Sequence, residues 1–549
     1  MKDLLFKISG FNEIDPFLMT ITSASDHWMY ISSSGCLTAG RQKPDYALFP
    51  YITDDLLHKN AGSTGPITAI KFGKKNKHSL WQPFSSQIDD FKKERNLYKN
   101  SLGNKIKFEE FNHTNGLTFS YSWHSSEEFG FVRKAVLNND SDDTIQISLV
   151  DGLRNIMPAG VELRTQQSMS NLANAYKVSE YNQNYNYALF YLNALLLDTP
   201  EPGESLNTNI VWSYYDGKNE VSLNEKSFNK FILDNVFPKD HLLKGKPGSY
   251  LKYIEKELDP GEKISWYIIG DVKKSQKDVT GTISHLKKTL TIKKKLEKSI
   301  EENYLAFEKY VGSADAFQCT NNNVNDLHHT ANVTYNVLRG GVFLNNYKIK
   351  RDNFLDFVKK RNVQLWNNYN SKINKLPEEF DLKMLKKFGD NSKNHSLMRL
   401  SREYLPLTLG RRHGDPSRPW NYFNIIVKDT NEQPKMYYEG NWRDIFQNWE
   451  ALALSYPESI ESMICIFLNA TSIDGYNPYR ITSEGIDWEV IEKDDSWSHI
   501  GYWNDHQIIY LLKLLEHSTD FYPGKLENLL CKKIFSYANI PYKIKSFKK

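Results

Sequence analysis

The first half of the chain alternates hydrophobic and polar residues over short runs, the pattern of strands with one buried face. Asn, Asp, Gly and Pro separate the runs and indicate turns. The predicted strands are residues 17–22, 28–32, 67–72, 117–123, 131–137, 144–149, 188–195, 209–215 and 264–270. Many short strands at this spacing predict a large antiparallel β-sandwich, a supersandwich, over residues 1–284.

The second half has apolar residues at helical spacing. A charged helix over residues 285–312 is predicted to link the sandwich to a helical domain over residues 313–549. The helices predicted there are residues 326–338, 353–368, 382–387, 396–404, 442–454, 457–470, 505–515 and 526–537. Helix pairs joined by loops rich in Trp, Arg, Asp and Tyr are typical of an (α/α)6 toroid. At ordinary helix lengths only about three or four pairs fit, so the toroid is expected to be partial.

Composition narrows the class of protein. A chain of 549 residues is too long for one ordinary core, which agrees with several domains. The aromatic content of 13% is high and has two explanations, large cores or ring stacking on sugars. A net charge of only +4 gives little support for nucleic-acid binding. No apolar run reaches membrane-spanning length, so no membrane role is expected.

The cysteines bear on cellular compartment and metal content. Cys36, Cys319, Cys465 and Cys531 lie far apart and lack metal-ligand spacing. Residues 1–6 do not have the pattern of a secretory signal peptide. We therefore expect reduced thiols, a cytoplasmic location, no metal site and no cofactor.

The candidate chemistry begins in residues 440–450, a polar and tryptophan-rich stretch at the start of a predicted helix. A sugar site needs forked donors and carboxylates for hydroxyl groups and flat rings for the apolar faces of a pyranose. In this interpretation Arg443 and Asp444 clamp adjacent hydroxyls, and Gln447 adds an amide one turn later. The alternative is helix capping by Asn441, with Asp444 favourable to the helix dipole.

A second stretch of the same character spans residues 476–489 and is predicted to be a loop between helices. The candidates in it are Tyr476, Arg480 and Trp488 for binding sugar, and Asp487 and Glu489 for catalysis. The alternative is an ordinary aromatic-rich loop packed on its own domain.

A third stretch, residues 497–506, opens the helix predicted from residue 505. Trp503 and His506 are candidates for substrate binding, and Asp505 is a further catalytic candidate. A helix N-cap at Asn504 or Asp505 is the alternative. Earlier in the chain, Arg411, Arg412 and His413 form a candidate anion site, because arginine forks suit phosphate; a solvated or paired loop is the alternative there.

One motif resembles a known family. Residues 441–448, Asn-Trp-Arg-Asp-Ile-Phe-Gln-Asn, are similar to the Gly-aromatic-Arg-Asp-x-x-Gln-Asp motif of inverting phosphorylases related to cellobiose phosphorylase (glycoside hydrolase family 94). Residues 33–35 with Arg41, followed by residues 80–83, resemble the first sandwich strands of that family. The resemblance implies a six-hairpin glycosidase fold and a sugar contact at Asn448, where the family has Asp.

The family's general acid lies in a Gly-Asp-Trp-Asn-Asp-Gly motif, which this sequence lacks. The resemblance therefore implies the N-terminal part of such an enzyme. The expected activity is inverting phosphorolysis or hydrolysis of β-linked gluco-oligosaccharides, with inorganic phosphate as a possible co-substrate. The alternative is a noncatalytic carbohydrate-binding or assembly half, partnered by a separately encoded C-terminal half or by a second copy.

Overall fold

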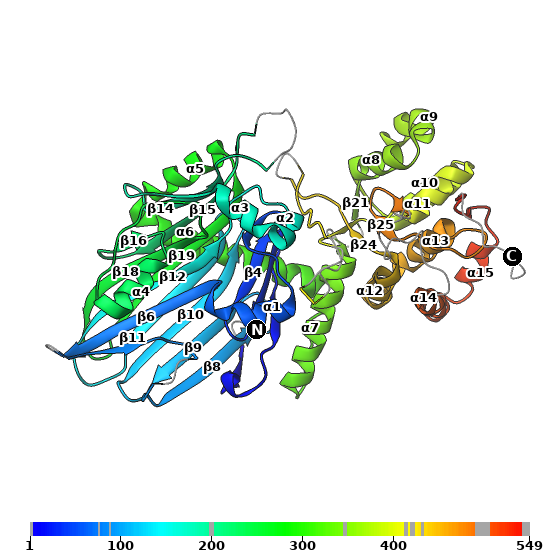
Figure 1. The fold of residues 1–549 in the computed structure, drawn as a ribbon. Coiled ribbons are helices and arrows are strands. Elements are labelled where there is room, and N and C mark those ends of the chain that lie inside the picture. The colour runs from blue at the N-terminus through cyan, green and yellow to red at the C-terminus, as the bar shows by residue number, and fades with distance from the viewer. Residues whose placement is uncertain are drawn as a thin grey trace, which may run out of the picture. The chain divides into compact units, whose positions relative to one another are not determined.

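The computed structural model describes residues 4–74, 77–86, 89–196, 203–343, 348–410, 416–417, 423–429, 433–488 and 506–540 (Figure 1). The chain divides into two compact units, and each is described by itself. Unit 1 comprises residues 1–307 and 414–422, and unit 2 comprises residues 308–413 and 423–549.

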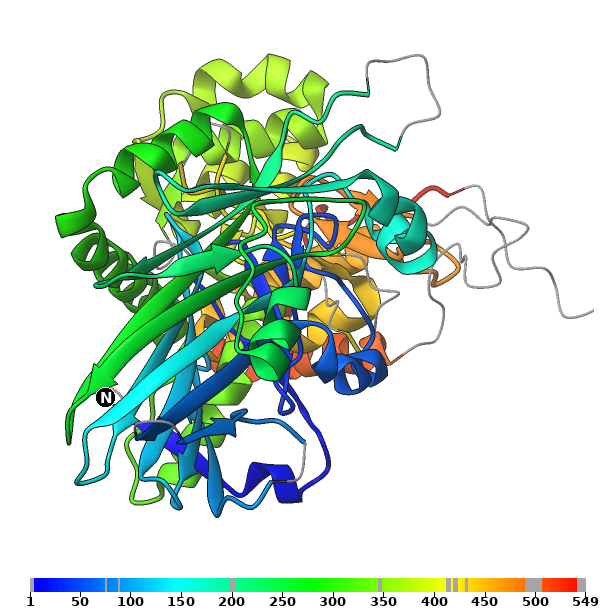
Figure 2. The same cartoon turned by 60° about the vertical axis from the view of Figure 1, so that its left-hand side comes forward.

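Unit 1 contains a ten-stranded and a five-stranded sheet, and all their strand pairs are antiparallel (Figure 1, Figure 2). Across the larger sheet the strands are β1 (Leu5–Ser9), β8 (Lys93–Asn100), β9 (Ile106–Asn112), β10 (Leu117–Ser126), β11 (Gly130–Asn139), β19 (Lys263–Lys274), β15 (Thr208–Tyr215), β14 (Tyr187–Leu192), β13 (Lys177–Asn182) and β17 (Leu242–Lys244). Across the smaller sheet they are β16 (Glu220–Ser222), β18 (Gly248–Leu258), β12 (Ile145–Ile156), β6 (Gly65–Lys74) and β7 (Lys77–Trp81). A further four-stranded sheet contains β2 (Leu18–Ile21), β3 (His27–Ser32), β4 (Leu37–Arg41) and β5 (Ala47–Phe49).

The core of unit 1 lies between the two large sheets, because one hydrophobic cluster takes inward-facing residues from both. A buried ion pair also joins them: Arg133 of β11 donates through Nη1 and Nη2 to Asp151 of β12, at 2.6 and 2.9 Å. The short helical elements of unit 1 are η1 (Phe11–Glu13), α1 (Asp54–Lys59), η2 (Asn60–Gly62), α2 (Leu163–Ser168), α3 (Ser170–Tyr176) and α4 (Lys226–Asp234).

Two helices follow the last strand of the sandwich, α5 (Gln276–Leu286) and α6 (Thr289–Ser313). Ile292 and Leu296 of α6 join Trp212 and Tyr267 in a second hydrophobic cluster, so this helix packs on the outer face of the ten-stranded sheet. The boundary between the units falls within α6, after Phe307. The charged helix predicted over residues 285–312 thus begins with the end of α5 and continues as α6.

Unit 2 is mainly helical. Its helical elements are α7 (Asn323–Gly340), α8 (Arg351–Arg361), α9 (Val363–Ile373), α10 (Leu382–Asn391), α11 (His395–Glu403), α12 (Trp442–Ser455), η3 (Pro457–Ser459), α13 (Ile460–Ala470), α14 (Gln507–Phe521) and α15 (Lys525–Leu530). Its strands are β20 (Val342–Phe343), β21 (Lys348–Lys350), β22 (Glu379–Asp381), β23 (Leu407–Thr408), β24 (Glu439–Asn441), β25 (Arg480–Thr482) and β26 (Ile486–Asp487). Helix α12 packs against α7 and α14.

The structure confirms a strand-rich N-terminal region, antiparallel throughout its large sheets, followed by helices. Two helix predictions were wrong in detail. Residues 353–368 do not form one helix, because Asn362 adopts an extended conformation and its side chain caps α9 by accepting from Leu365 N. The last predicted helix is also shorter, since α15 ends at Leu530.

Candidate functional site

A small sheet in unit 2 brings two of the polar and aromatic stretches together. Strand β24 pairs with β25, with Asn441 opposite Arg480, and β25 pairs with β26, with Arg480 opposite Asp487. Trp442 N, at the start of α12, donates to Tyr479 O at 2.9 Å. The beginning of α12 and residues 476–488 therefore form one local structure, although about thirty residues of chain separate them.

The sheet carries a cluster of charged side chains centred on Arg480. Arg480 Nε donates to Asp487 Oδ2 at 2.8 Å, and Arg480 Nη1 lies 3.9 Å from Glu439 Oε1. Glu439 is buried and accepts a hydrogen bond from Tyr437 Oη at 2.7 Å through its other oxygen. Burial, and next the nearby Glu439 charge, raise the pKa of Tyr437. Sequence reasoning missed Glu439, which stands directly before the stretch that it identified.

The first two turns of α12 present two of the predicted sugar contacts on one face. Arg443 and Gln447 lie four residues apart on the helix and both are exposed. Asp444 is partly buried, and Asn441 Nδ2 donates to its Oδ2 at 3.5 Å. Asn441 occupies the N-cap position but makes no side-chain capping bond to the backbone, whereas Asp444 does lie in the first turn, where a carboxylate favours the helix dipole.

Asn448 lies on a different side of α12. Its side chain is buried, its Nδ2 donates to Asp444 O at 3.0 Å, and it packs against Gly340 of α7 so closely that a Cβ on that glycine would lie 3.0 Å from Asn448 Cβ. This position points Asn448 away from the face shared by Arg443 and Gln447.

The two tryptophans of α12 are not available to a sugar, contrary to what a tryptophan-rich stretch suggests. The rings of Trp442 and Trp449 are fully buried and form edge contacts with Phe446, and Trp449 Nε1 donates to Gly340 O at 2.9 Å. They are core residues of unit 2 and cannot stack on a sugar. Tyr476, Tyr479 and Trp488 of the second stretch are only partly buried, so their rings remain accessible.

The start of α14 adjoins the same region. Gln507 Nε2 donates to Asn477 Oδ1 at 3.0 Å, which ties α14 to the loop ahead of β25. Burial raises the pKa of Tyr510, with smaller contributions from the charges of Glu450 and Asp444 on α12. His506 lies beside Tyr510, with ring centroids 6.2 Å apart. His506 therefore lies in the same neighbourhood as the other candidate binding residues.

Several predicted residues lie outside the described part of the chain. These are the catalytic candidates Glu489 and Asp505, the binding candidate Trp503, and the anion-binding candidates Arg411, Arg412 and His413. Asp487 is the predicted catalytic carboxylate that the structure describes, and it is held by Arg480.

Residues 349–404 form a subdomain beside this sheet, with a hydrophobic core of their own that includes Phe354, Leu385 and Leu400. The ends of the subdomain are held together, because β20 pairs with β23 and places Val342 opposite Thr408. The last residues of α8 contact the β25–β26 turn, with Lys360 Nζ 2.8 Å from Glu484 Oε1 and Arg361 Nη2 donating to Thr482 O at 3.3 Å.

The subdomain also contributes a buried carboxylate. Glu403 of α11 accepts from Asn469 Nδ2 of α13 at 2.7 Å, and Arg399 Nη1 lies 3.2 Å away. Burial raises the pKa of Glu403, although both partners oppose the shift. These contacts attach the subdomain to the helices of unit 2 as well as to the small sheet.

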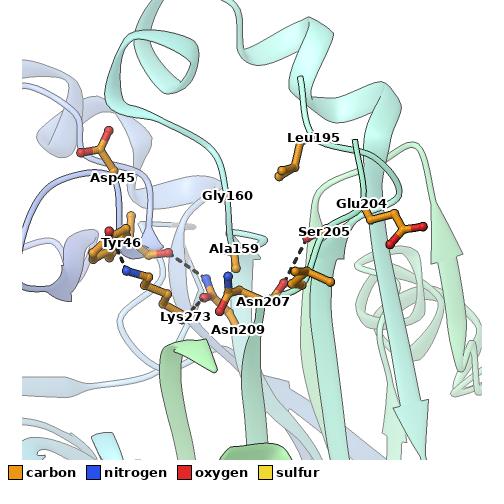
Figure 3. Close-up of a pocket in the computed structure, with 12 residues that line it drawn as sticks. Asp45, Tyr46, Ala159, Gly160, Leu195, Glu204, Ser205, Asn207, Asn209 and Lys273 are labelled. Atoms are coloured by element: carbon orange, nitrogen blue, oxygen red, sulfur yellow. Dashed lines mark hydrogen bonds between the residues drawn. The ribbon is translucent and has the colours of Figure 1, made fainter. Parts of the chain in front are cut away.

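A small cavity of about 210 Å³ lies in unit 1 (Figure 3). Lys273 Nζ donates to Tyr46 Oη at 2.7 Å and lies 3.8 Å from the centroid of the Tyr46 ring. Asn209 uses its amide to donate to Ala47 O and Met157 O and to accept from Lys273 N. Because these polar groups form their hydrogen bonds within the protein, we assign them a structural role.

Metal ligands, disulfides and membrane-spanning helices are the remaining features that bear on function. In the described ranges, no three His, Cys, Asp or Glu side chains are grouped as metal ligands would be. All four cysteines are free thiols. None of the described helices combines the length and the apolar character that crossing a bilayer requires.

The comparison with protein families gives one match. Residues 343–406 match the model described as glycoside hydrolase family 149 insertion domain 1. The matched segment coincides with the subdomain that has its own core and whose ends are joined by β20 and β23. The subdomain is therefore similar to an insertion domain of a carbohydrate-active enzyme family, and we call it the insertion subdomain.

Solved structures give weaker similarities. A bacterial glucoamylase complexed with acarbose shares 10% identity over 95% of this chain and 67% of its own, with a TM-score of 0.38. A putative kojibiose phosphorylase from the human microbiome shares 10% identity over 84% of this chain and 47% of its own, with a TM-score of 0.27. A galactose mutarotase-like protein from Lactobacillus casei shares 10% identity over 47% of this chain and 100% of its own, with a TM-score of 0.25. No curated protein matches the chain in sequence.

Proposed function

We propose that the protein acts on glycosidic bonds of β-linked gluco-oligosaccharides, by inverting phosphorolysis or hydrolysis. The observation that carries the proposal is the match of residues 343–406 to a glycoside hydrolase insertion domain. The motif at residues 441–448, similar to that of cellobiose phosphorylases, adds support, and so does a partial (α/α)6 toroid as the arrangement of unit 2.

The candidate residues make different kinds of contact with the sugar. Arg443 and Asp444 bind adjacent hydroxyl groups, and Gln447 donates or accepts one further hydrogen bond. Tyr476 and Trp488 offer partly exposed rings to the apolar faces of the sugar. Arg480 orients Asp487, to which it donates at 2.8 Å, at the edge of the same sheet.

Inversion requires one carboxylic acid to protonate the leaving oxygen. An inverting hydrolase also needs a carboxylate base about 6.5–9.5 Å from the acid, with a water molecule between them. Phosphate is already anionic and needs no base. The candidate acids are Asp487, Glu489 and Asp505, and Arg411, Arg412 and His413 are the candidates for binding phosphate.

The activity is tested by incubating the purified chain with cellobiose, laminaribiose and sophorose, with and without phosphate. Release of glucose 1-phosphate only when phosphate is present identifies a phosphorylase, and release of glucose without phosphate identifies a hydrolase. If none of the three disaccharides yields either product, the enzymatic proposal fails for these substrates.

A second candidate function is noncatalytic carbohydrate binding, with a separately encoded C-terminal half or a second copy of the chain as partner. The absence of a Gly-Asp-Trp-Asn-Asp-Gly motif from the sequence favours it. Calorimetry with the same glucans separates the two functions, because binding without turnover supports this one.

A further inference from the structure

A cavity of unit 1 has a volume of about 610 Å³, within the range of about 300–1,000 Å³ that is usual for ligand sites. It is bordered by the β3–β4 turn, by the loop after β7, by strands β8 to β10 and by α4. Both sequence segments of unit 1 that resemble family 94, residues 33–35 and 80–83, contribute residues to its wall.

One wall of the cavity is aromatic. The rings of Phe108 and Tyr121 stack with centroids 4.9 Å apart and planes inclined by 16°. Phe84 meets both rings edge-on, at 6.1 Å from Phe108 and 5.4 Å from Tyr121, and is only partly buried. Together they form a rigid apolar surface beside polar groups, which is the combination that a sugar ring requires.

The loop that carries Phe84 is held in place by a buried carboxylate. Glu110 is fully buried and accepts from Trp81 Nε1 at 2.7 Å, from Phe84 N at 2.8 Å and from Arg95 Nε at 2.6 Å. Arg95 Nη2 also donates to Ser85 O at 2.6 Å. Phe84 has a φ of 62°, a left-handed conformation that is unfavourable for an aromatic residue and persists only where the surroundings enforce it.

A polar group on the same wall has unused hydrogen-bonding capacity. Tyr121 is 4% exposed, and within the described ranges its hydroxyl forms no hydrogen bond with the protein. Gly35 lies so close that a Cβ on it would be 3.1 Å from Tyr121 Oη, so glycine leaves space in front of this hydroxyl. The hydroxyl oxygen opens on the cavity, so a hydroxyl group of a bound ligand would supply a hydrogen-bond partner.

The arginine side chains that line the cavity are each paired with a carboxylate. Arg95 pairs with Glu110 at 2.6 Å, and Arg154 lies 3.5 Å from Glu225 Oε1 and also donates to Ala61 O and Gly62 O. A phosphate or carboxylate ligand would need a guanidinium without such partners. The lining therefore favours a neutral ligand that combines apolar faces with hydroxyl groups.

We propose that this cavity is a second carbohydrate site, which binds a short neutral oligosaccharide against Phe84, Phe108 and Tyr121. The proposal rests on the proposed function for the class of ligand, and it assigns that ligand to unit 1 independently of the residues around β24 and α12. Phe84 supplies the stacking surface, Tyr121 Oη donates to a sugar hydroxyl, and Glu110 keeps the loop in position.

The test uses the full chain with cellotriose and laminaritriose. Hydrogen exchange measured by mass spectrometry locates the ligand, and we expect protection in peptides covering residues 79–86. Tyr121→Phe keeps the ring and removes the hydroxyl, and we expect a loss of affinity of about tenfold by calorimetry. Phe84→Gly suits the left-handed backbone but removes the ring, so affinity should fall by roughly tenfold while the fold is retained.

Arg443→Ala alters the proposed unit 2 site and leaves the cavity intact, so protection of residues 79–86 from hydrogen exchange should persist in this variant even though its total glucan binding is weaker. Protection confined to residues 439–488, or affinity unaltered in both Tyr121→Phe and Phe84→Gly, would overturn the inference without touching the proposed function. Protection at residues 79–86 in a chain that releases no product would support the inference and count against the enzymatic proposal. Absence of protection anywhere would overturn the inference.

Discussion

Arg480 and Asp487 face each other across neighbouring strands β25 and β26, with Nε 2.8 Å from Oδ2. The same guanidinium lies 3.9 Å from the buried Glu439 on β24. One side chain thus lies beside an exposed carboxylate and a buried one.

Arg480→Gln should destabilise the protein by about 1–3 kcal/mol, because it removes the positive charge that lies 3.9 Å from the buried Glu439 carboxylate. Asp487→Asn should cost less than about 1 kcal/mol, since half of the Asp487 side chain is exposed to solvent. Urea denaturation of both variants measures the difference. Equal losses in the two variants would show that Glu439 does not depend on Arg480.

Arg443→Ala should weaken glucan binding by about tenfold or more, because a hydrogen bond to a charged group contributes about 1.5–3 kcal/mol. The side chain is exposed on α12, so stability should change by less than about 0.5 kcal/mol. Calorimetry and thermal unfolding test the two parts. If affinity at the unit 2 site is unchanged, the sugar interpretation of residues 440–450 is wrong.

Asp151→Asn should destabilise the protein by about 3–5 kcal/mol, because it leaves Arg133 charged and buried without its counterion. The variant also alters the acceptors of Trp266 Nε1 at 2.6 Å and Thr68 Oγ1 at 2.7 Å. Glu302→Gln breaks the exposed pair with Lys298 and is the control, with an expected cost below about 1 kcal/mol. Denaturant unfolding should separate the two variants clearly, and similar costs would argue against the buried pair as a major contribution.

The stability of unit 1 should fall between pH 6.5 and about 4. Burial, and next the charge of Arg41, lower the pKa of His27 from 6.5 to about 4. As the pH falls through this window the unfolded chain binds a proton that the folded chain does not, so stability is lost. The contribution of His27 is about 3 kcal/mol, at about 1.4 kcal/mol per pKa unit.

His27→Gln removes this titration and should make the pH dependence of unfolding shallower. Unfolding by urea at a series of pH values from 7 down to about 4 measures the slope. An identical slope in the variant would show that His27 does not titrate differently in the folded and unfolded chains.

The local pattern of hydrophobic and polar residues predicts much of the fold but less of the candidate site. Period-two alternation predicts strands such as residues 117–123 and 264–270, which fall inside β10 and β19. The tryptophan-rich character of residues 440–450 is part of the reason for predicting a sugar site there, although Trp442, Phe446 and Trp449 stand at positions i, i+4 and i+7 of one helix, the spacing of a buried stripe. That signal was available in the sequence and correctly indicates a core.

Other features could not be predicted, because they depend on contacts between distant segments. Glu439 is significant only because β25 brings Arg480 beside it. At Asn362 the chain can either continue α8 or cap the start of α9. The spacing of apolar residues is the same in both cases, so it does not predict the break. The cavity next to Tyr121 is likewise formed by several strands and loops that are far apart in the sequence.

The pairing of β20 with β23 has an evolutionary consequence. Because Val342 and Thr408 lie opposite each other, the chain leaves and re-enters the helical part of unit 2 at nearly the same point. A short turn between these strands would be enough to bypass the whole insertion subdomain, whose core is self-contained. A lineage could therefore gain, lose or exchange this module in one genetic event.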